Sequence, residues 1–292
     1  MNKLNQKKIL LTGGSGFLGF HFLTRYPDLF IPLCSPISRT VFPHMLAVNL
    51  NKTEDIQALR KIPFDAIIHL AAMADTKVCE ENPQISYRTN VQSTKELCEI
   101  AAKRKIPIVF TSTDLVFDGQ LAPYSENHKP APVNQYGKHK AEAEKEILSL
   151  YPEALICRLS LMYGYKQAKT GTYFNHLFQS LRSEKKVSLF KDEFRSVVAA
   201  DDVVTFIIDQ LETARGIVHL GGPDSLSRLE IGKVFCSVFN FRPELLQACS
   251  QNDFPSNAPR PANVSMDISL AKSMGFKPKT LEEGLQLVKS SY

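Results

Sequence analysis

Residues 12–19 read Thr12-Gly-Gly-Ser-Gly-Phe-Leu-Gly19 and follow an apolar run from Lys8 to Leu11. The glycines at 13, 16 and 19 give the spacing G-x-x-G-x-x-G. Glycine permits a tight turn, lets the backbone approach a pyrophosphate and lets a helix pack on a strand. A phosphate there would face the free N–H groups of a helix N-terminus. The order of strand, glycine turn and helix predicts a dinucleotide-binding turn, and an ordinary glycine-rich turn is the alternative.

Apolar runs and helical patterns alternate after this turn. Strands are expected at 30–35, 47–50, 65–72, 106–113 and 154–161, and helices at 53–61, 85–105 and 134–150. Such alternation is typical of an α/β protein with a Rossmann-type doubly wound parallel sheet. Thr53 is the expected N-cap of its helix. The second strand is expected to start at Pro32, because proline is disfavoured inside a strand.

The pattern loosens after residue 162. We expect a polar loop at 165–172, helices at 173–183, 201–211 and 227–240, strands at 187–190 and 216–220, and two short C-terminal helical segments. Ser227 and Glu230 have the spacing of a capping box. The predicted organisation is a dinucleotide-binding Rossmann domain over residues 1–162. Residues 163–292 are then mainly a small C-terminal substrate-binding lobe, with some segments returning to the sheet.

The composition is that of an ordinary globular protein, with 292 residues, 43% hydrophobic and 22% charged. The net charge of +5 is dispersed, which favours an anionic small ligand and not nucleic acid. Six cysteines without a C-x-x-C pair indicate reduced thiols and a cytoplasmic protein. The histidines have no metal-ligand spacing, and no segment is apolar enough for a membrane span.

A candidate acid–base pair lies at Tyr136 and Lys140 in the expected helix 134–150. Residues four apart share one helix face, and an ammonium one turn away favours the ionised phenol. Such a pair suits general acid–base catalysis. An isolated Tyr-x-x-x-Lys is more often plain helix surface. The glycine turn and the hydroxyl-rich strand end Thr111-Ser-Thr-Asp114 make the catalytic interpretation the stronger one here.

These motifs occur together with Ser112-Thr-Asp-Leu-Val-Phe-Asp-Gly119, Pro123-Tyr-Ser-Glu126, Pro132-Val-Asn-Gln-Tyr-Gly-Lys-His-Lys140 and Arg260-Pro-Ala-Asn-Val-Ser-Met-Asp267. In this order the chain resembles the extended short-chain dehydrogenase/reductase superfamily over nearly its whole length. Within it, the chain resembles dTDP-4-dehydrorhamnose reductases. It equally resembles a related group, the regulatory beta subunits of methionine adenosyltransferase.

The resemblance implies roles for individual residues. Tyr136 would protonate a ketone, Lys140 would hold the nicotinamide ribose, and Thr113, with Ser112, would bind the substrate carbonyl. The implied cofactor-binding residues are Gly13, Ser15, Gly16, Phe17, Leu18, Gly19, Ser35, Arg39, Ala71, Ala72, Met73, Asn90, Tyr136 and Lys140. The implied substrate-binding residues are Ser112, Thr113, Asp114, Asn175, Arg195 and Arg260. Asn90 could instead be a structural hydrogen-bonding residue, and either arginine a surface salt bridge.

The second strand also bears on the choice of cofactor. NAD-specific Rossmann sites usually carry an acid about 20 residues after the glycine turn. This strand ends Leu33-Cys-Ser-Pro-Ile-Ser-Arg39 without an acid, and Asp28 comes too early. A guanidinium suits a 2′-phosphate, so Arg39, with Ser35 and Ser38, favours NADP(H); use of NAD(H) as well stays open. The alternative is that Arg39 is a solvated loop residue.

The expected function is NADPH-dependent reduction of a nucleotide-linked 4-keto-6-deoxy sugar. Related 4,6-dehydratases carry Thr-Asp-Glu where this chain has Thr113-Asp114-Leu115, and leucine cannot act as a base. A nucleotide-sugar epimerase and a non-catalytic NADP-binding regulatory subunit stay as alternatives. Many relatives have an aromatic residue after the sixth strand, where this chain reads Leu161-Met-Tyr-Gly164; either Tyr163 replaces it or the contact is missing. A homodimer is compatible with the sequence.

Overall fold

The computed structural model of the chain describes residues 7–165 and 171–292. They form two compact units. Unit 1 takes the described residues of Met1–Thr113, with Asn134–Cys157 and Ile207–Ile217. Unit 2 takes Asp114–Val133, the described residues of Arg158–Phe206, and Val218–Tyr292. The segment 114–133 therefore leaves unit 1 before the helix that carries Tyr136. The assignment of cofactor and substrate to residues 1–162 and 163–292 stays a prediction.

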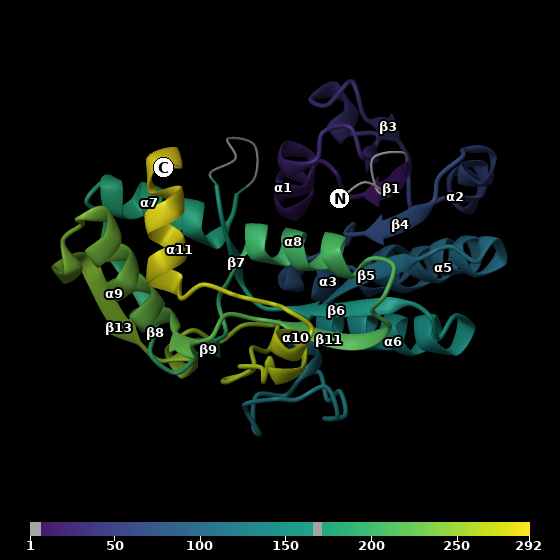
Figure 1. Cartoon of the computed structure of the whole chain (residues 1–292). Coiled ribbons are helices and arrows are strands. Elements are labelled where there is room, and N and C mark those ends of the chain that lie inside the picture. The colour runs from purple at the N-terminus through teal and green to yellow at the C-terminus, as the bar shows by residue number, and fades with distance from the viewer. Residues whose placement is uncertain (1–6, 166–170) are drawn as a thin grey trace. The chain divides into compact units, whose positions relative to one another are not determined.

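A seven-stranded sheet has the order β11-β6-β5-β4-β1-β2-β3 (Figure 1). Its strands are β1 (Ile9–Thr12), β2 (Phe30–Cys34), β3 (Leu46–Ala47), β4 (Ala66–His69), β5 (Ile108–Thr113), β6 (Leu155–Leu159) and β11 (Gly216–Leu220). β1 pairs in parallel with β2 and with β4, β4 with β5, and β2 with β3. From β1 the chain adds β2 and β3 on one side, and then β4, β5, β6 and β11 on the other side, as in doubly wound folds. The predicted Rossmann-type α/β fold is confirmed.

The helices of unit 1 cover this sheet. They are α1 (Phe17–Arg25), α2 (Thr53–Ala58) with the 3-10 turn η2 (Leu59–Lys61), α3 (Thr76–Glu81), α4 (Pro83–Tyr87), the π-helical η3 (Arg88–Gln92), α5 (Ser93–Arg104) and α6 (Gln135–Leu150). A short 3-10 turn, η1 (Ser38–Thr40), follows β2. Helices α5 and α6 lie side by side, α5 against β4 and α6 against β5 (Figure 1). Buried apolar side chains of these strands and helices make one core, which includes Leu10, Ile67 and Ile147.

Unit 2 is built from helices and two-stranded pairings. The strands are β7 (Met162–Tyr163), β8 (Val187–Phe190), β9 (Phe194–Arg195), β10 (Val198–Ala199), β12 (Leu226–Ser227) and β13 (Leu246–Cys249). The helices are α7 (Tyr173–Arg182), α8 (Ala200–Gln210), α9 (Arg228–Phe239), α10 (Ser269–Ser273) and α11 (Leu281–Val288), and the last turn of α8 belongs to unit 1. Short 3-10 turns are η4 (Asp114–Val116), η5 (Pro243–Leu245), η6 (Gln251–Asp253) and η7 (Lys289–Ser291). A core rich in phenylalanine, including Phe174, Phe178 and Phe235, joins α7, α9 and α11.

Several local predictions are confirmed. Strands β8 and β11 have the expected bounds, and α6 begins one residue after Asn134, the N-cap whose side chain accepts the N–H of Gly137 at 2.9 Å. Ser227 caps α9, and the reciprocal bond from Glu230 completes the predicted capping box. The expected loop at 165–172 lies mostly outside the described residues.

Other local predictions were wrong. Strand β2 begins at Phe30, not at Pro32; its pairing with β3 starts only at Leu33, so no ladder partner faces Pro32 on that side. Thr53 is the first helical residue of α2 and not its cap; its hydroxyl instead donates to Glu96 Oε1 at 3.1 Å. β3 has two residues instead of four. The helix expected from Ile85 contains a π turn, and α3 was not predicted.

Candidate active site

The glycine turn has the geometry that its spacing predicts. Gly13 adopts φ +71°, a left-handed conformation, and a Cβ at this position would lie 2.8 Å from the backbone nitrogen of Ala71. A Cβ on Gly19 would lie 2.4 Å from the carbonyl oxygen of Gly13. Only glycine satisfies both conditions. The turn therefore packs closely on α1 and on the end of β4.

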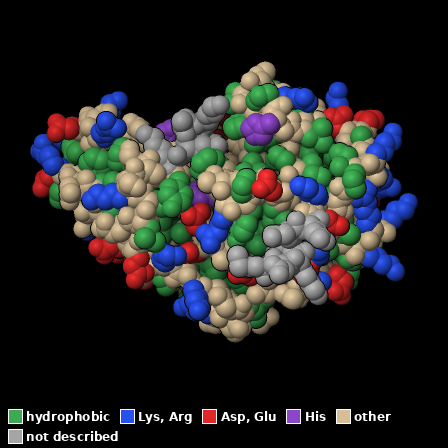
Figure 2. Space-filling model, turned by 45° about the horizontal axis from the view of Figure 1, so that its top comes forward, with side chains coloured by type: hydrophobic (Ala, Val, Ile, Leu, Met, Phe, Trp, Pro, Cys, Tyr) green, Lys and Arg blue, Asp and Glu red, His purple; other side chains and the backbone are tan. Residues whose placement is uncertain are grey.

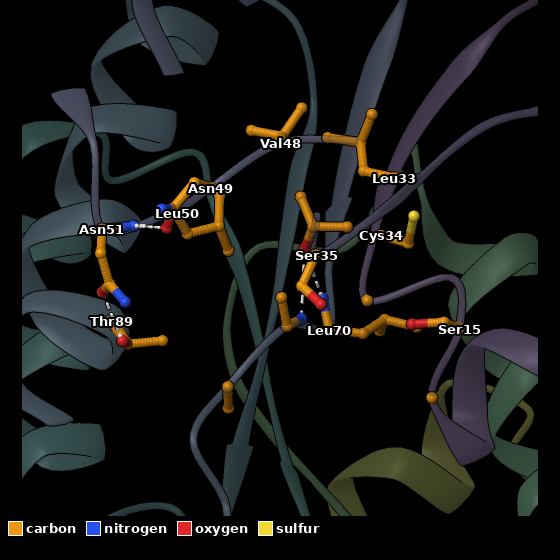
Figure 3. Close-up of a pocket in the computed structure, with 15 residues that line it drawn as sticks. Ser15, Leu33, Cys34, Ser35, Val48, Asn49, Leu50, Asn51, Leu70 and Thr89 are labelled. Carbon is orange, nitrogen blue, oxygen red and sulfur yellow. Dashed lines mark hydrogen bonds between the residues drawn. The ribbon is translucent and has the colours of Figure 1, made fainter. Parts of the chain in front are cut away.

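A cavity of about 310 Å³ opens beside this turn (Figure 3). Its volume is at the lower end of the range for small-molecule sites. Figure 3 shows Ser15 at one side, Asn51 and Thr89 at the other, and Ser35 and Leu70 between them. The walls come from the turn, the end of β2, the segment after β3, the end of β4 and η3. The lining residues are Thr12, Gly13, Ser15, Gly16, Leu33, Cys34, Ser35, Val48, Asn49, Leu50, Asn51, Leu70, Ala71, Ala72 and Thr89.

Part of the predicted cofactor set lines this cavity, namely Gly13, Ser15, Gly16, Ser35, Ala71 and Ala72. The rest lies outside the lining, namely Phe17, Leu18, Gly19, Arg39, Met73, Asn90, Tyr136 and Lys140. All of these residues belong to unit 1. Their contact with a cofactor stays a prediction. The structure adds a buried role for Asn90, whose side chain accepts the N–H of Met73 at 2.9 Å and donates to its carbonyl at 3.0 Å.

The wall formed by Val48 to Asn51 was not predicted. β3 ends at Ala47, so this segment is free to line the cavity instead of continuing the sheet. Thr89 donates to the side-chain oxygen of Asn51 at 2.6 Å, and the backbone N–H of Asn51 donates to that of Asn49 at 3.0 Å. The sequence feature that could have indicated this wall was the expected strand 47–50, because ligands bind at the carboxyl ends of the strands in such a sheet.

The end of β2 forms a polar corner of the cavity. The hydroxyls of Ser35 and Ser38 lie 2.9 Å apart, and the N–H of Arg39 donates to the carbonyl of Ser35 at 3.2 Å. The Arg39 side chain is exposed in η1. Burial raises the pKa of the Cys34 thiol, while the charge of Arg39 acts in the opposite direction. The guanidinium therefore lies close enough to a lining residue for its charge to be felt there.

Helix α6 carries Tyr136 in its first turn and Lys140 in its second. Tyr136 is half-buried, whereas Lys140 is only 2% exposed. The Lys140 ammonium lies over the ring of Phe110, 4.0 Å from its centroid. Burial lowers the pKa of Lys140 to about 7, and the Glu144 carboxylate one turn later acts in the opposite direction. This lysine is thus poised between its charged and neutral forms near neutral pH.

Ser112 and Thr113 end β5, and both are buried. The hydroxyl oxygen of Ser112 has no hydrogen-bond partner within the described part of the chain. Buried polar groups normally have partners, so an unsatisfied hydroxyl requires an explanation.

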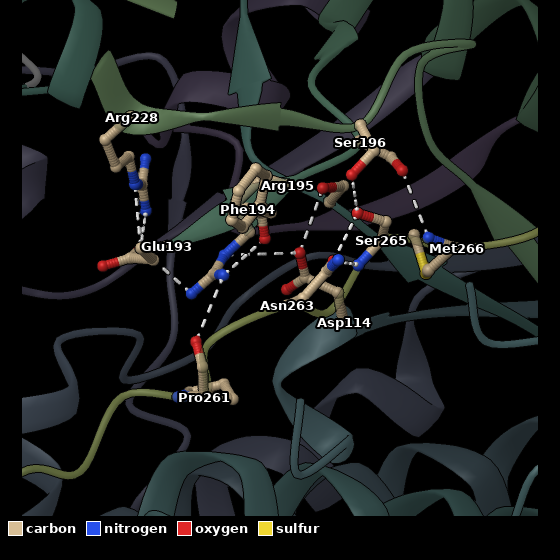
Figure 4. A network of polar contacts seen from close by, with 12 residues as sticks. Asp114, Glu193, Phe194, Arg195, Ser196, Arg228, Pro261, Asn263, Ser265 and Met266 are labelled. Atoms are coloured by element: carbon tan, nitrogen blue, oxygen red, sulfur yellow. Dashed lines mark hydrogen bonds and ion pairs between the residues drawn. The ribbon is translucent and has the colours of Figure 1, made fainter. Parts of the chain in front are cut away.

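The predicted substrate residues Asp114 and Arg195 meet inside unit 2, in a buried network of charges (Figure 4). Arg195 lies between two carboxylates: its Nη2 is 3.0 Å from Glu193 Oε1, and its Nε is 3.8 Å from Asp114 Oδ2. Arg228 also pairs with Glu193, at 2.6 Å, and Ser160 donates to Asp114 at 3.0 Å. Arg195 is therefore not a surface salt bridge.

The other two predicted substrate residues also lie in unit 2. Arg260 is exposed, with its guanidinium 5.4 Å from the ring centroid of Phe190. Asn175 is half-buried in the first turn of α7. Tyr163 cannot replace a substrate-stacking aromatic residue, because its side chain is fully buried in the core and its hydroxyl donates to the carbonyl of Thr280 at 3.2 Å.

Residues 7–165 and 171–292 contain no helix that is long and apolar enough to cross a membrane. They also contain no group of three or more His, Cys, Asp or Glu side chains that could hold a metal ion. The cysteines described are all free thiols. Figure 2 shows basic side chains (blue) at several places along the margin of the molecule, with acidic side chains (red) among them.

Comparison with protein families gives a match over almost the whole chain. The family described as "RmlD substrate binding domain" matches residues 7–292. A probable low-salt glycan biosynthesis reductase, Agl14 of Haloferax volcanii, is 28% identical over 84% of this chain and 84% of its own length. Methionine adenosyltransferase 2 subunit beta of Xenopus laevis is 27% identical over 94% of this chain and 84% of its own length.

Among solved structures, the chain is similar to dTDP-4-dehydrorhamnose reductase of Bacillus anthracis in complex with NADP. The TM-score is 0.86 and the identity 23%, covering 98% of this chain and 99% of that one. This likeness establishes the fold.

Proposed function

We propose that this chain is an NADPH-dependent reductase of a nucleotide-linked 4-keto-6-deoxy sugar. The chain belongs to the RmlD substrate-binding domain family and to the extended short-chain dehydrogenase/reductase superfamily. Relatives described as a glycan biosynthesis reductase and a dTDP-4-dehydrorhamnose reductase support an oxidoreductase acting on a nucleotide sugar. One observation carries the proposal. Unit 1 combines the cavity at the glycine turn with α6, whose second turn holds the buried Lys140.

The residues at the glycine turn fit a dinucleotide. Without Cβ atoms at Gly13 and Gly19 the turn packs closely on the end of β4 and on α1, the arrangement in which such a turn accepts a pyrophosphate. Ala71 and Ala72 would face the adenosine side, and Ser35 with Arg39 would meet a 2′-phosphate. The bound cofactor supplies the hydride.

The remaining chemistry belongs to the chain itself. Tyr136 donates its hydroxyl proton to the substrate oxygen, and Lys140 in its protonated form favours the loss of that proton and bonds the cofactor ribose. Thr113 and Ser112 donate hydrogen bonds to the substrate carbonyl, which supplies the partner that Ser112 Oγ requires. Exposed Arg260 would meet the anions of the nucleotide, and Asn175 of α7 would also contact the substrate.

The network of Asp114 supports reduction over dehydration. Dehydration requires a free acid and a base after β5. Asp114 accepts a hydrogen bond from Ser160 and faces Arg195, and its neighbour Leu115 has no titratable group. Asp114 is thus engaged within unit 2 by a hydroxyl and a guanidinium. Reduction needs only Tyr136 and the carbonyl-binding hydroxyls.

The test supplies purified protein with NADPH and a dTDP-4-keto-6-deoxyhexose. We expect one NADPH consumed per product formed, seen as loss of the nicotinamide absorbance. UDP-, GDP- and CDP-linked 4-keto sugars then identify the nucleotide. An epimerase regenerates its cofactor, so epimerised product without net NADPH consumption would contradict the proposal.

The second candidate function is a non-catalytic regulatory subunit. It is favoured by the methionine adenosyltransferase beta subunit, which matches 94% of this chain. Turnover separates the two functions. A regulatory subunit would co-elute with a catalytic methionine adenosyltransferase chain in gel filtration and would leave NADPH intact with every 4-keto sugar.

A further inference from the structure

A fully buried histidine joins the glycine turn to α5. His69, the last residue of β4, has its Nδ1 2.6 Å from Thr12 Oγ1 and its Nε2 2.9 Å from Thr94 Oγ1. Thr12 lines the cavity, whereas His69 and Thr94 do not. All three side chains are at most 1% exposed. No sequence pattern had pointed to His69 or Thr94.

The neighbours of these threonines fix the direction of each hydrogen bond. Thr94 Oγ1 donates to the carbonyl of Asn90 at 2.8 Å, so it accepts from His69 Nε2–H. Thr12 Oγ1 accepts the backbone N–H groups of Leu70 and Ala71, each at 3.1 Å, so it donates to His69 Nδ1. His69 is therefore neutral and carries its proton on Nε2. Burial and the charge of Lys140 lower its pKa to about 3, in agreement with this assignment.

Asn90 continues the chain of bonds toward α6. Because Asn90 Oδ1 accepts the N–H of Met73, its Nδ2 is the donor to Ser86 Oγ, at 3.2 Å. The Ser86 hydroxyl also lies 2.8 Å from His139 Nδ1, and the His139 tautomer sets the direction of that bond. Ser86 and Asn90 are at most 1% exposed and His139 7%. His139 directly precedes Lys140 in α6.

The π turn explains how Asn90 can bond both to Thr94, the partner of His69, and to Ser86, the partner of His139. Asn90 lies at the centre of η3, the π-helical segment Arg88–Gln92. Such segments interrupt an α-helix locally and are frequent at functional sites. Here the backbone carbonyl of Asn90 accepts from Thr94, while its side chain holds both polar backbone atoms of Met73 and reaches Ser86.

We infer that the buried chain Thr12–His69–Thr94–Asn90–Ser86–His139 positions the cofactor turn against the helix of Tyr136 and Lys140. His69, Thr94, Ser86 and His139 are then positioning residues that act on cofactor binding through Asn90 and Thr12. The inference rests on the proposed function only in requiring that unit 1 binds a nicotinamide cofactor.

Nuclear magnetic resonance of protein labelled with 15N-histidine tests the direction of the chain. We expect His69 to show an unprotonated Nδ1 and a protonated Nε2 between about pH 6 and pH 8, and the tautomer of His139 gives the direction of its bond with Ser86. An imidazolium, or a proton on Nδ1, at His69 would overturn the assignment. Thr94→Val and Ser86→Ala identify the two resonances, since each removes the partner of one ring.

Cofactor affinity, measured by calorimetry with NADPH, tests the positioning role. Ser86 and Thr94 lie outside the cavity, so a purely local role leaves the dissociation constant unchanged. We expect Ser86→Ala and Thr94→Val each to raise it by about 10-fold, and Thr94→Ser, which keeps the hydroxyl, to stay near wild type. In the double variant Ser86→Ala/Thr94→Val the effects should not multiply, because both act in one network.

The outcomes separate this inference from the proposed function. Wild-type protein that binds NADPH while both single variants keep its affinity overturns the positioning role alone. Multiplying effects in the double variant overturn the connection through Asn90. Wild-type protein that binds no nicotinamide cofactor overturns both the positioning role and the proposed function.

Discussion

Unit 1 and unit 2 each bury a cation, and they hold it in opposite ways. The ammonium of Lys140 lies over the ring of Phe110, and burial lowers its pKa to about 7. The guanidinium of Arg195 lies between Glu193 and Asp114; burial lowers its pKa as well, and the two carboxylates act in the opposite direction. One cation is left able to change its charge, and the other is fixed in a network.

The difference indicates which cation carries chemistry. A desolvated lysine whose charge is only marginally stable can respond to a ligand or a neighbouring phenol. A buried arginine paired with carboxylates is weak evidence for function, because removing either partner leaves an uncompensated charge in the interior. We therefore expect changes at Lys140 to appear in turnover, and changes at Arg195 to appear first in folding.

The largest expected effect is on stability in unit 2. Arg195→Met leaves Glu193 and Asp114 buried without their shared cation, which should lower the free energy of unfolding by about 3–5 kcal/mol. Urea denaturation measures this. Glu193 keeps its pair with Arg228, so in the double variant Arg195→Met/Asp114→Asn the added loss should be small or negative, since the orphaned charge is removed. A fully stable Arg195→Met protein with a raised Michaelis constant would instead restore the substrate-binding role predicted from the sequence.

The next effect is on turnover in unit 1. Tyr136→Phe keeps the ring and removes the proton, so NADPH-dependent turnover should fall by about 100-fold or more with folding intact. Lys140→Met should lower turnover and cofactor affinity together, without the loss of stability expected for Arg195→Met. Steady-state rates measure the turnover of both variants, and thermal unfolding measures their stability. Near-normal turnover of Tyr136→Phe would remove this residue from the mechanism.

The pH dependence of stability sharpens the contrast further. The pKa of Lys140 is about 7 in the folded protein and 10.5 ordinarily, so between these values the unfolded chain binds the additional proton. Stability must therefore rise with pH above about 7, on the order of 2 kcal/mol by pH 9. Unfolding free energies of wild type minus Lys140→Met, measured across this range, isolate the lysine. A difference that is flat with pH would show that Lys140 keeps its charge when folded.

How far could the two cations be told apart from the sequence? Tyr136 and Lys140 were identified because a spacing of four residues fixes a common helix face. The glycine turn was identified for a similar reason, since its chemistry is local. Arg195 and Asp114 are 81 positions apart in the chain, and their pairing depends on how unit 2 folds. No local pattern reports such a pairing.

The same limit explains why the cavity wall and the role of the buried histidine were not predicted from the sequence. Val48 to Asn51 line the cavity because β3 stops after two residues, and strand ends are poorly determined by local sequence. His69 was read as part of a buried apolar strand. Its function in the hydrogen-bond chain appears only when Thr12 and Thr94, each remote in sequence, are brought to its two nitrogens.

Exposed cations extend the comparison to charges that water screens. Arg39 is exposed at the corner of the cavity beside Ser35. Arg39→Ala should weaken NADPH binding by about 10-fold, the effect of losing one charged contact to a 2′-phosphate, and leave NADH binding unchanged. Calorimetry with both cofactors measures this, and Arg39→Lys is the matched control, with an intermediate affinity expected. Equal NADPH affinity in wild type and Arg39→Ala would mean that Arg39 is the solvated loop residue of the alternative interpretation.

The smallest effect is expected at Arg260, the exposed counterpart of Arg195 in unit 2. Its guanidinium lies 5.4 Å from the ring centroid of Phe190 and is open to solvent, so its removal should hardly change the free energy of unfolding. If it meets the pyrophosphate of the substrate, Arg260→Ala should raise the Michaelis constant for the nucleotide sugar by about 5-fold and leave turnover at saturation unchanged, because the contact is the same in the bound and reacting states.

Added salt should raise the wild-type Michaelis constant toward that of the variant, since an exposed charge is screened. Arg260→Lys keeps the charge and should lie between the two. Identical Michaelis constants for wild type and Arg260→Ala at low salt would place the phosphate contact on another residue, and a lower turnover in Arg260→Ala would give this arginine a part in the reaction itself.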